Sequence, residues 1–461
     1  MLSGKLADWA SALSFGQIPP AIIADAKLRV LDICGVTVAA HPTDAGKIMR
    51  EAALRLGPAG AGHAARILSF GDAAAPASAA LANGTMAHVH DFDDTHSLAR
   101  IHISAPVVST ALALGEALRA DGRSLLAAIV AGSETAARLG TMAPGKFHDH
   151  GFHATGIVGA VGAAVTAGKL MHLPSEKLRN AIGIVASQAA GTAECFTDGT
   201  WTKRLHAGWA AHCGIAAAQL ADCGFTGPIK SLDGERGLFN AHLGRGDHPY
   251  AQVMDGLGTR WLCADSSFKP YPCGHLIHGF VEAIYMLREE TGLRVDNVAS
   301  ITCPVAPWVM PMICEPRAEK AAPATEAQAK ISLPYCVAAA LVLNRMDLQA
   351  FMPQAIADPR IHAVAEKVTC ISDANAPEDQ SKGWVIATMT SGRRVETVIE
   401  NGLGSVANPM SEDEVKQKFR DNMIFAGLGA NATAAIECVD RLDALNDIAA
   451  LVTLCCRVIP V

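Results

Sequence analysis

The chain has 461 residues, which is long for one hydrophobic core, so we expect two or more domains. Half of the residues are hydrophobic, and the formal net charge of −7 comes without a Lys/Arg cluster, so nucleic acid is not an expected partner. The 13 cysteines include no CxxC pair, which is typical of reduced thiols. With no leader pattern and no bilayer-length apolar run, we expect a soluble cytoplasmic protein without a membrane partner.

Apolar periodicity predicts that residues 1–265 are almost wholly helical. Helices are expected at residues 21–39, 104–118, 156–171 and 203–223, and from Ser124 and Ser175 onward. Ser104 is expected to be an N-cap, with Pro106 in the first helical turn.

The pattern changes near Phe268. A helix is predicted at residues 275–292, strands at 298–305 and 367–372, and a β-hairpin at 384–390 and 394–400. Ser411 and Glu414 form a capping box before a last helix. We therefore predict a mostly α-helical protein: a large, discontinuous all-α domain (1–267 and 404–461) and a smaller α+β domain (268–403).

The most polar stretch runs from Asn83 to His102. Three carboxylates and four histidines fall within it, although charged residues make up only 18% of the chain. If it is helical, His88, Asp91 and Thr95 share one face and offer a base and hydrogen-bond donors. Asp93 and Asp94 are then expected only to support or solvate the helix. The plain alternative is an exposed acidic turn.

Two further motifs precede predicted helices. His153 enters the helix at 156–171, where a neutral imidazole could act as a base or donor. A metal site at His148, His150 and His153 is an alternative, but the odd spacing argues against it, so we expect no metal ligands. Lys203 opens the next helix and could bind a carboxylate. The plain alternatives are a solvated loop and a basic residue flanking a helix.

A fourth motif, residues 268–278, lies where the pattern changes, and a loop joining two domains commonly lines a cleft. No GxGxxG, Walker, GxSxG or HExxH pattern occurs, so nucleotide-binding, serine-hydrolase and zincin functions lose support.

Taken together, the ordered motifs resemble the MmgE/PrpD family, which includes 2-methylcitrate dehydratase, cis-aconitate decarboxylase and iminodisuccinate epimerase. The resemblance covers nearly the full length and is carried by residues 83–95, 102–106, 151–155, 202–208, 268–272 and 329–335. It implies that the α+β domain is a lid, that the pocket lies between the domains, that the protein is a homodimer, and that no cofactor is used. The active-site positions implied by the family are Asp91, Thr95, His102, His153 and Lys203.

The chain also departs from the family's decarboxylases, which carry a His near Gly274 and a Tyr near Trp308. We expect His275 and Trp308, at or beside these places, to contact substrate. Relative to the decarboxylases, this chain also has one extra residue between Thr95 and His102.

The predicted function is a lyase that removes a proton α to a carboxylate of a small di- or tricarboxylate, first of all a 2-methylcitrate-dehydratase-like hydro-lyase. The alternatives are an epimerase of an imino- or amino-dicarboxylate, a cis-aconitate decarboxylase, and a non-catalytic carboxylate-binding protein. His102 is predicted to be the base with Asp91 orienting it, His153 the acid, and Lys203 and Thr95 the carboxylate ligands.

Overall fold

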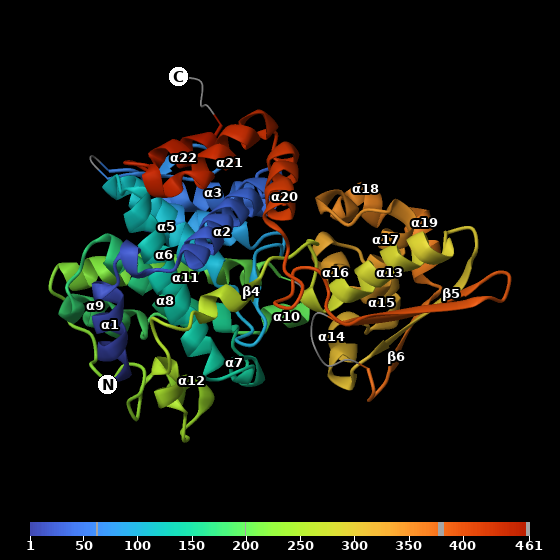
Figure 1. Cartoon of the computed structure of the whole chain (residues 1–461), viewed down its shortest axis with the longest axis horizontal. Helices are drawn as coiled ribbons and strands as arrows, with labels where there is room; N and C mark the ends of the chain where they lie inside the picture. The colour runs from blue at the N-terminus through green and yellow to red at the C-terminus, as the bar shows by residue number, and fades with distance from the viewer. Residues whose placement is uncertain (61–62, 199, 377–381, 458–461) are drawn as a thin grey trace. The chain divides into compact units, whose positions relative to one another are not determined.

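The chain forms two compact units in the computed structural model, which describes residues 1–60, 63–198, 200–376 and 382–457 (Figure 1). The first unit comprises Met1–Ser266 and Ser411–Val461, and the second comprises Ser267–Met410. The described residues are mostly α-helical, as predicted. None of the helices in this part of the chain combines the length and apolar character needed to cross a bilayer.

The first unit is built of helices, with three short strands. Its helices before residue 266 are α1 (Leu2–Ala12), α2 (Pro20–Ala39), α3 (Asp44–Leu56), α4 (Pro76–Ala87), α5 (Ser104–Leu118), α6 (Gly122–Thr141), α7 (Lys146–Asp149), α8 (Ala154–Leu170), α9 (Ser175–Val185), α10 (Cys195–Asp198), α11 (Thr202–Asp222) and α12 (Leu238–Leu243). Its last helices are α20 (Glu412–Phe425), α21 (Ala432–Asp440) and α22 (Ala449–Leu454). Its strands are β1 (Ala65–Arg66), β2 (Ala73–Ala74) and β3 (Thr95–His96).

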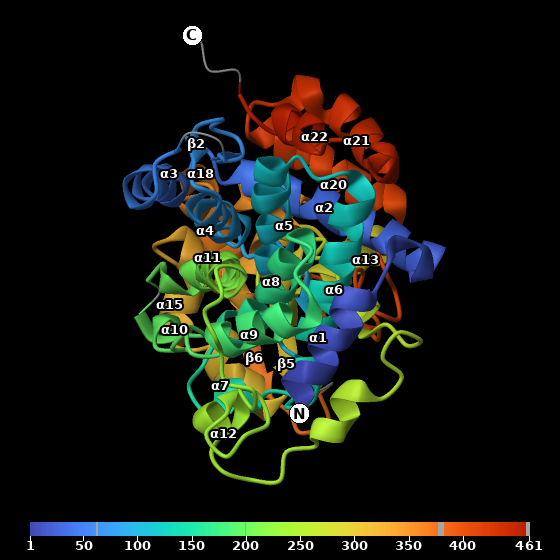
Figure 2. The same cartoon turned by 90° about the vertical axis from the view of Figure 1, so that its left-hand side faces the viewer.

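Helix α8 is the centre of the first unit. Every residue of α8 except Lys169 is buried, and Figure 2 shows the helix among α5, α6, α9 and α11, which it contacts. Small residues also let α11 approach α4 closely. A Cβ atom on Gly208 of α11 would lie only 2.2 Å from the carbonyl oxygen of Leu81 in α4. The beginning of α11 is therefore packed against α4, whose end leads into the polar stretch.

The C-terminal segment returns to the first unit through α20, which packs along α2 (Figures 1 and 2). Ser411 caps α20 with the predicted capping box to Glu414. Between the two helices, the ammonium of Lys418 lies 2.7 Å from the carboxylate of Asp32, and both side chains are buried. Lys418 also donates to the carbonyl oxygen of Phe92 at 2.7 Å, which fixes the polar stretch to the end of the chain.

The second unit is a four-stranded sheet covered by helices. Its sheet has the order β6 (Val368–Ser372), β5 (Val298–Val305), β7 (Gly383–Met389), β8 (Arg394–Ile399). Its helices are α13 (His278–Thr291), α14 (Met310–Ile313), α15 (Arg317–Ala321), α16 (Glu326–Lys330), α17 (Leu333–Leu343), α18 (Pro353–Ile356) and α19 (Pro359–Ala365). The short strand β4 (Ser266–Ser267) lies at the boundary of the units.

Register in this sheet follows the predicted alternation of apolar residues. Ile301 of β5 faces Val368 in the parallel pair with β6 and Ala387 in the antiparallel pair with β7. The predicted hairpin of β7 and β8 is confirmed. Helices α13 and α17 pack on each other, α13 against β7 and β8 and α17 against β6, and they bury an apolar core.

Two local predictions are wrong. Residues 88–95 are not helical, because α4 ends at Ala87 and Asp91 adopts a left-handed backbone with φ of 52°. Aspartate side chains that bond nearby groups compete with the helix, and Asp tolerates this conformation. Ser104 is the first residue of α5 rather than its cap, and its hydroxyl donates to the carboxylate of Asp94.

Candidate active site

The polar stretch after α4 is fixed by Asp94. The carboxylate of Asp94 accepts the backbone N–H of Ser104 at 3.0 Å and its hydroxyl at 2.7 Å, which ties the loop to the start of α5. The guanidinium of Arg29 in α2 lies 2.8 Å from the same carboxylate. Asp94 is therefore a buried structural anchor, which agrees with the expected supporting role, although it supports a loop and not a helix.

Asp93 orients two imidazoles. Nδ1 of His88 lies 2.8 Å from a carboxylate oxygen of Asp93. Nδ1 of His102 lies 2.9 Å from the carbonyl oxygen of Asp94 and 3.3 Å from the carboxylate of Asp93. Because both Nδ1 atoms face acceptors, we assign the proton of each neutral ring to Nδ1. The Nε2 atom of each ring then carries a lone pair.

Lys203 brings a cation to this loop from the first turn of α11. Its ammonium lies 2.8 Å from a carboxylate oxygen of Asp91, and that oxygen is 4.0 Å from Nε2 of His102. A cation, a carboxylate and an imidazole lone pair therefore adjoin one another. The hydroxyl of Thr95, in β3, is buried and has no hydrogen-bond partner among the described residues.

His153 precedes α8 and faces the other histidines. Its ring centroid is 5.8 Å from that of His88 and 6.0 Å from that of His102. Its Nδ1 lies 3.0 Å from Nδ1 of His206, and its Nε2 lies 3.1 Å from the hydroxyl oxygen of Thr155. Two helices thus fix the orientation of this ring.

Burial favours the uncharged form of the imidazoles of His88, His153 and His206. It lowers the pKa of His88 to about 4, with the cation of Lys203 adding to the effect. Burial and neighbouring imidazoles hold the pKa of His153 well below its ordinary value, and burial lowers that of His206 to about 4. Burial alone would raise the pKa of Asp93, but its contacts with the imidazoles of His88 and His102 outweigh this and lower it. The site therefore combines the carboxylates of Asp91 and Asp93 with the neutral rings of His88, His153 and His206.

Of the predicted residues, Asp91, His102 and Lys203 are brought together, and His153 lies beside His102. Thr95 lies in the same polar stretch. The two predicted substrate contacts His275 and Trp308 belong to the second unit. The imidazole of His275 is buried with its ring 5.1 Å from that of His278, and Trp308 is 36% exposed.

Sequence reasoning missed His88, Asp93 and His206 as members of the cluster. His88 was considered only as part of a helical face, and Asp93 only as support. His206 stands three residues after Lys203, on the same side of a helix, and that spacing is a usable signal. The pairing of His88 with Asp93 had no such signal, because it depends on the irregular loop.

The potential metal ligands come from separate segments. Nitrogen atoms of His88, His102 and His153 lie within 4.8 Å of one another, and His88, His102, Asp91 and Asp93 form an overlapping set. His148 has its ring 5.9 Å from that of His153, whereas His150 is exposed. Of the three histidines in the alternative metal site, only His153 therefore belongs to a set of converging potential ligands among the described residues.

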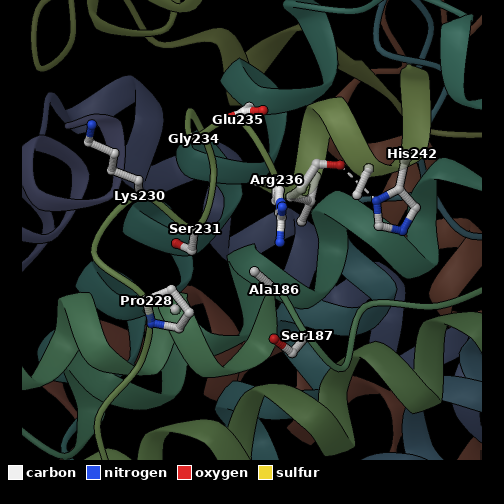
Figure 3. A pocket seen from close by; sticks show the side chains of 13 residues that line it. Ala186, Ser187, Pro228, Lys230, Ser231, Gly234, Glu235, Arg236 and His242 are labelled. Carbon is white, nitrogen blue, oxygen red and sulfur yellow. Dashed lines mark hydrogen bonds between the residues drawn. The ribbon is translucent and has the colours of Figure 1, made fainter. Parts of the chain in front are cut away.

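A cavity lies elsewhere on the first unit. It is a cavity of about 360 Å³ near the end of α9 and at α12, and Figure 3 shows Lys230, Ser231 and Arg236 around it. It shares no lining residue with the histidine cluster. The cavity is therefore separate from the histidine cluster.

Comparison with known proteins agrees with the ordered motifs. The N-terminal domain of the MmgE/PrpD family matches residues 4–251, and its C-terminal domain matches residues 271–443. A cis-aconitate decarboxylase of Aspergillus terreus is 27% identical over 98% of this chain and 95% of its own length. The cis-aconitate decarboxylase of Homo sapiens is 29% identical over 82% of this chain and 79% of its own. That of Mus musculus is 28% identical over 82% and 78%.

Proposed function

The chain belongs to the MmgE/PrpD family, and we propose that it is a cofactor-independent lyase that moves a proton at a carbon next to a carboxylate of a small di- or tricarboxylate. One observation carries this proposal. The ion pair of Lys203 and Asp91 lies beside the Nε2 lone pair of His102. A proton α to a carboxylate is weakly acidic, so its removal needs a base and a nearby cation to hold the developing negative charge.

His102 is the proposed base, since its Nδ1 is held by the carbonyl of Asp94 and its Nε2 faces Asp91. Asp91 and Lys203 give the site both charges, and Lys203 with Thr95 would bind substrate carboxylates. The lowered pKa of His153 favours its neutral form, and both of its ring nitrogens contact protein groups, so we propose that it is not the acid. Lys203, as an ammonium, is then the proposed proton donor in place of His153.

Decarboxylation of cis-aconitate is the first specific candidate. The relatives that align with most of this chain carry that name, and the proposed machinery suits the reaction. Loss of CO₂ leaves an electron pair that the conjugated carboxylate spreads, and a proton donor then completes the product. Lys203 would stabilise that charge and supply the proton.

Dehydration is the second candidate. The family's decarboxylases carry a His near the position of Gly274 and a Tyr near that of Trp308, and the lack of both groups in this chain weakens the case for decarboxylation. In this reaction His102 would remove the α proton, and Lys203 would protonate the hydroxide that leaves. Epimerisation would need only return of the proton to the opposite face. The three outcomes share one carbanion, so the substrate decides among them.

Incubation of the full-length protein in D₂O with cis-aconitate, 2-methylcitrate, citrate and amino- or iminodicarboxylates tests the proposal, with NMR as the readout. Release of CO₂ identifies a decarboxylase, an alkene with loss of water a dehydratase, and deuterium at the α carbon without elimination an epimerase. Thermal stabilisation by a dicarboxylate with no turnover of any candidate would identify a non-catalytic binding protein and overturn the proposal.

A further inference from the structure

Three imidazoles converge in the candidate site from three separate segments. His88 follows α4, His102 precedes α5, and His153 precedes α8. One nitrogen atom of each lies within 4.8 Å of the others, and all three side chains are buried. The ring centroids of His88 and His102 are 4.4 Å apart. Burial of polar rings is costly unless their nitrogens have partners, so the contacts of each ring matter.

The second-layer contacts match those of metal-binding histidines. His88 gives its Nδ1 proton to the carboxylate of Asp93, and His102 gives its own to the carbonyl oxygen of Asp94. Metal-ligating histidines are commonly held in this way, with the other ring nitrogen left for the ion. Nε2 of His88 is buried and has no hydrogen-bond partner among the residues that the structure describes.

We propose that His88, His102 and His153 bind one divalent first-row transition ion, such as Zn²⁺, as three neutral nitrogen ligands. Zinc takes imidazole nitrogens at about 2.0–2.1 Å and accepts a solvent molecule as its fourth ligand. The donor nitrogens lie within 4.8 Å of one another, and the ion would replace one of the contacts that the ring nitrogens of His153 make with Thr155 and His206. Imidazole donors favour Zn²⁺, Co²⁺ or Ni²⁺ over Mg²⁺ and Ca²⁺, which prefer oxygen ligands.

The ion has a predictable effect on activity, and this part of the inference depends on the proposed function. It takes the Nε2 lone pair of His102, which is the base in the proposed proton abstraction. It also places a second positive charge near Lys203. Binding of the ion and proton abstraction are therefore mutually exclusive, and the metal is a reversible inhibitor that a chelator removes.

Calorimetric titration of the chelator-treated full-length protein with Zn²⁺ tests binding without reference to catalysis. We expect one ion per chain, no comparable binding of Mg²⁺, and loss of the site in His88→Ala. Asp93→Asn should weaken binding about 10–100-fold, because it removes the orienting carboxylate. His150→Ala, which removes an exposed imidazole, is the matched control and should bind like the wild type.

Circular dichroism checks that each variant is folded. If His88→Ala does not fold, Asp93→Asn still tests the site. Equal Zn²⁺ binding by the wild type and a folded His88→Ala or Asp93→Asn variant overturns the site. Activity that requires Zn²⁺ overturns the inhibitory role. Zinc binding without turnover of any acid leaves the site standing and removes only the proposed function, whereas turnover without zinc binding does the reverse.

Discussion

The chemistry of the candidate site is set by which nitrogen of each imidazole is free. The contacts of His88 and His102 place both Nδ1 atoms against oxygen acceptors. A histidine oriented in this way presents one lone pair in one direction, which makes it a better base than a ring that can rotate. The ammonium of Lys203 contacts the carboxylate oxygen of Asp91 that lies 4.0 Å from Nε2 of His102. The position of each functional atom therefore depends on groups that do not react.

For a dehydration or an epimerisation, in which His102 removes the α proton, replacement of His102 by Ala should lower kcat by about 10²–10⁴, the usual contribution of a positioned general base. Steady-state kinetics on the substrate identified by NMR would measure it, with circular dichroism to confirm folding. His150→Ala is the control, since His150 is exposed and outside the cluster. Near-wild-type turnover in His102→Ala would refute the assignment of the base.

Replacement of Lys203 by Ala should also reduce kcat steeply, because the transition state loses its cation and Asp91 loses its partner. Lys230→Ala makes the same change in charge at an exposed position outside the cluster, and it should leave kcat unchanged. If both variants lose activity equally, the effect is one of overall charge and not of the site.

Stability should depend on pH through the buried imidazoles. The pKa of His88 is about 4 in the folded protein against 6.5 ordinarily, so between these pH values the unfolded chain binds more protons. The free energy of unfolding is therefore highest above pH 6.5 and falls toward pH 4, by about 1.4 kcal/mol per pH unit for this group. Urea unfolding at pH 7.5, 6 and 5 measures the slope, and His88→Gln should flatten it. An unchanged slope in that variant would contradict a neutral, buried His88.

Among the elements, the contact of α4 with α11 decides how the site is assembled. One helix leads into His88 and the other carries Lys203 and His206, so their spacing sets the distance between the two halves of the cluster. Gly208 in α11 lets the two helices lie close together, because it has no side chain to hold them apart.

Gly208→Ala should therefore be destabilising. Its Cβ would stand 2.2 Å from the carbonyl oxygen of Leu81 and from the hydroxyl of Thr85, so α11 must move away from α4. Overpacking of this kind costs about 1–3 kcal/mol, and a thermal melt should show a lower Tm. Gly16→Ala is the control, because no atom lies within 4 Å of its added Cβ. Equal Tm values for the two variants would show that the helices do not need this approach.

The buried ion pair between α2 and α20 is the second decisive contact. Lys418→Met leaves the carboxylate of Asp32 buried without its cation, which costs about 3–5 kcal/mol. Burial raises the pKa of Asp32 to about 6, so the loss should be larger at pH 8 than at pH 5, where the carboxyl takes up a proton. Chemical denaturation at both pH values measures this. Lys47→Met, at an exposed position, should change little at either pH.

At the scale of the whole molecule, the two units differ in whether one continuous stretch of the sequence forms them. The second unit is one continuous stretch with its own core around Tyr335 and Phe351, whereas the first needs residues from both ends of the chain. A domain with its own core can fold alone.

A fragment of residues 267–410 should therefore unfold cooperatively in urea by circular dichroism. A fragment of residues 1–266 should not, because α2 loses α20 and Asp32 loses Lys418. The fragment of residues 267–410 is the critical one: absence of a cooperative transition would mean that its core is not self-sufficient.

The expected homodimer stays a prediction, and light scattering of the full-length protein after gel filtration would measure it.

The sequence by itself determined the class of the fold, most elements and the family. Helical periodicity in α2, α8 and α11 and alternation in β5, β7 and β8 are local properties, because each element presents its buried face at a fixed spacing. The motifs also named Asp91, His102 and Lys203 correctly as neighbours.

Only the tertiary structure decided how those side chains face one another. Helix α4 ends at Ala87, Asp91 is left-handed, and in the irregular loop that follows α4 the carboxylate of Asp93 lies against His88 and His102. Contacts between residues far apart in the sequence, such as His153 with His206, leave no periodic signal. The physical reason is that burial and hydrogen bonding in the folded chain, not residue type, fix the protonation state and direction of each imidazole.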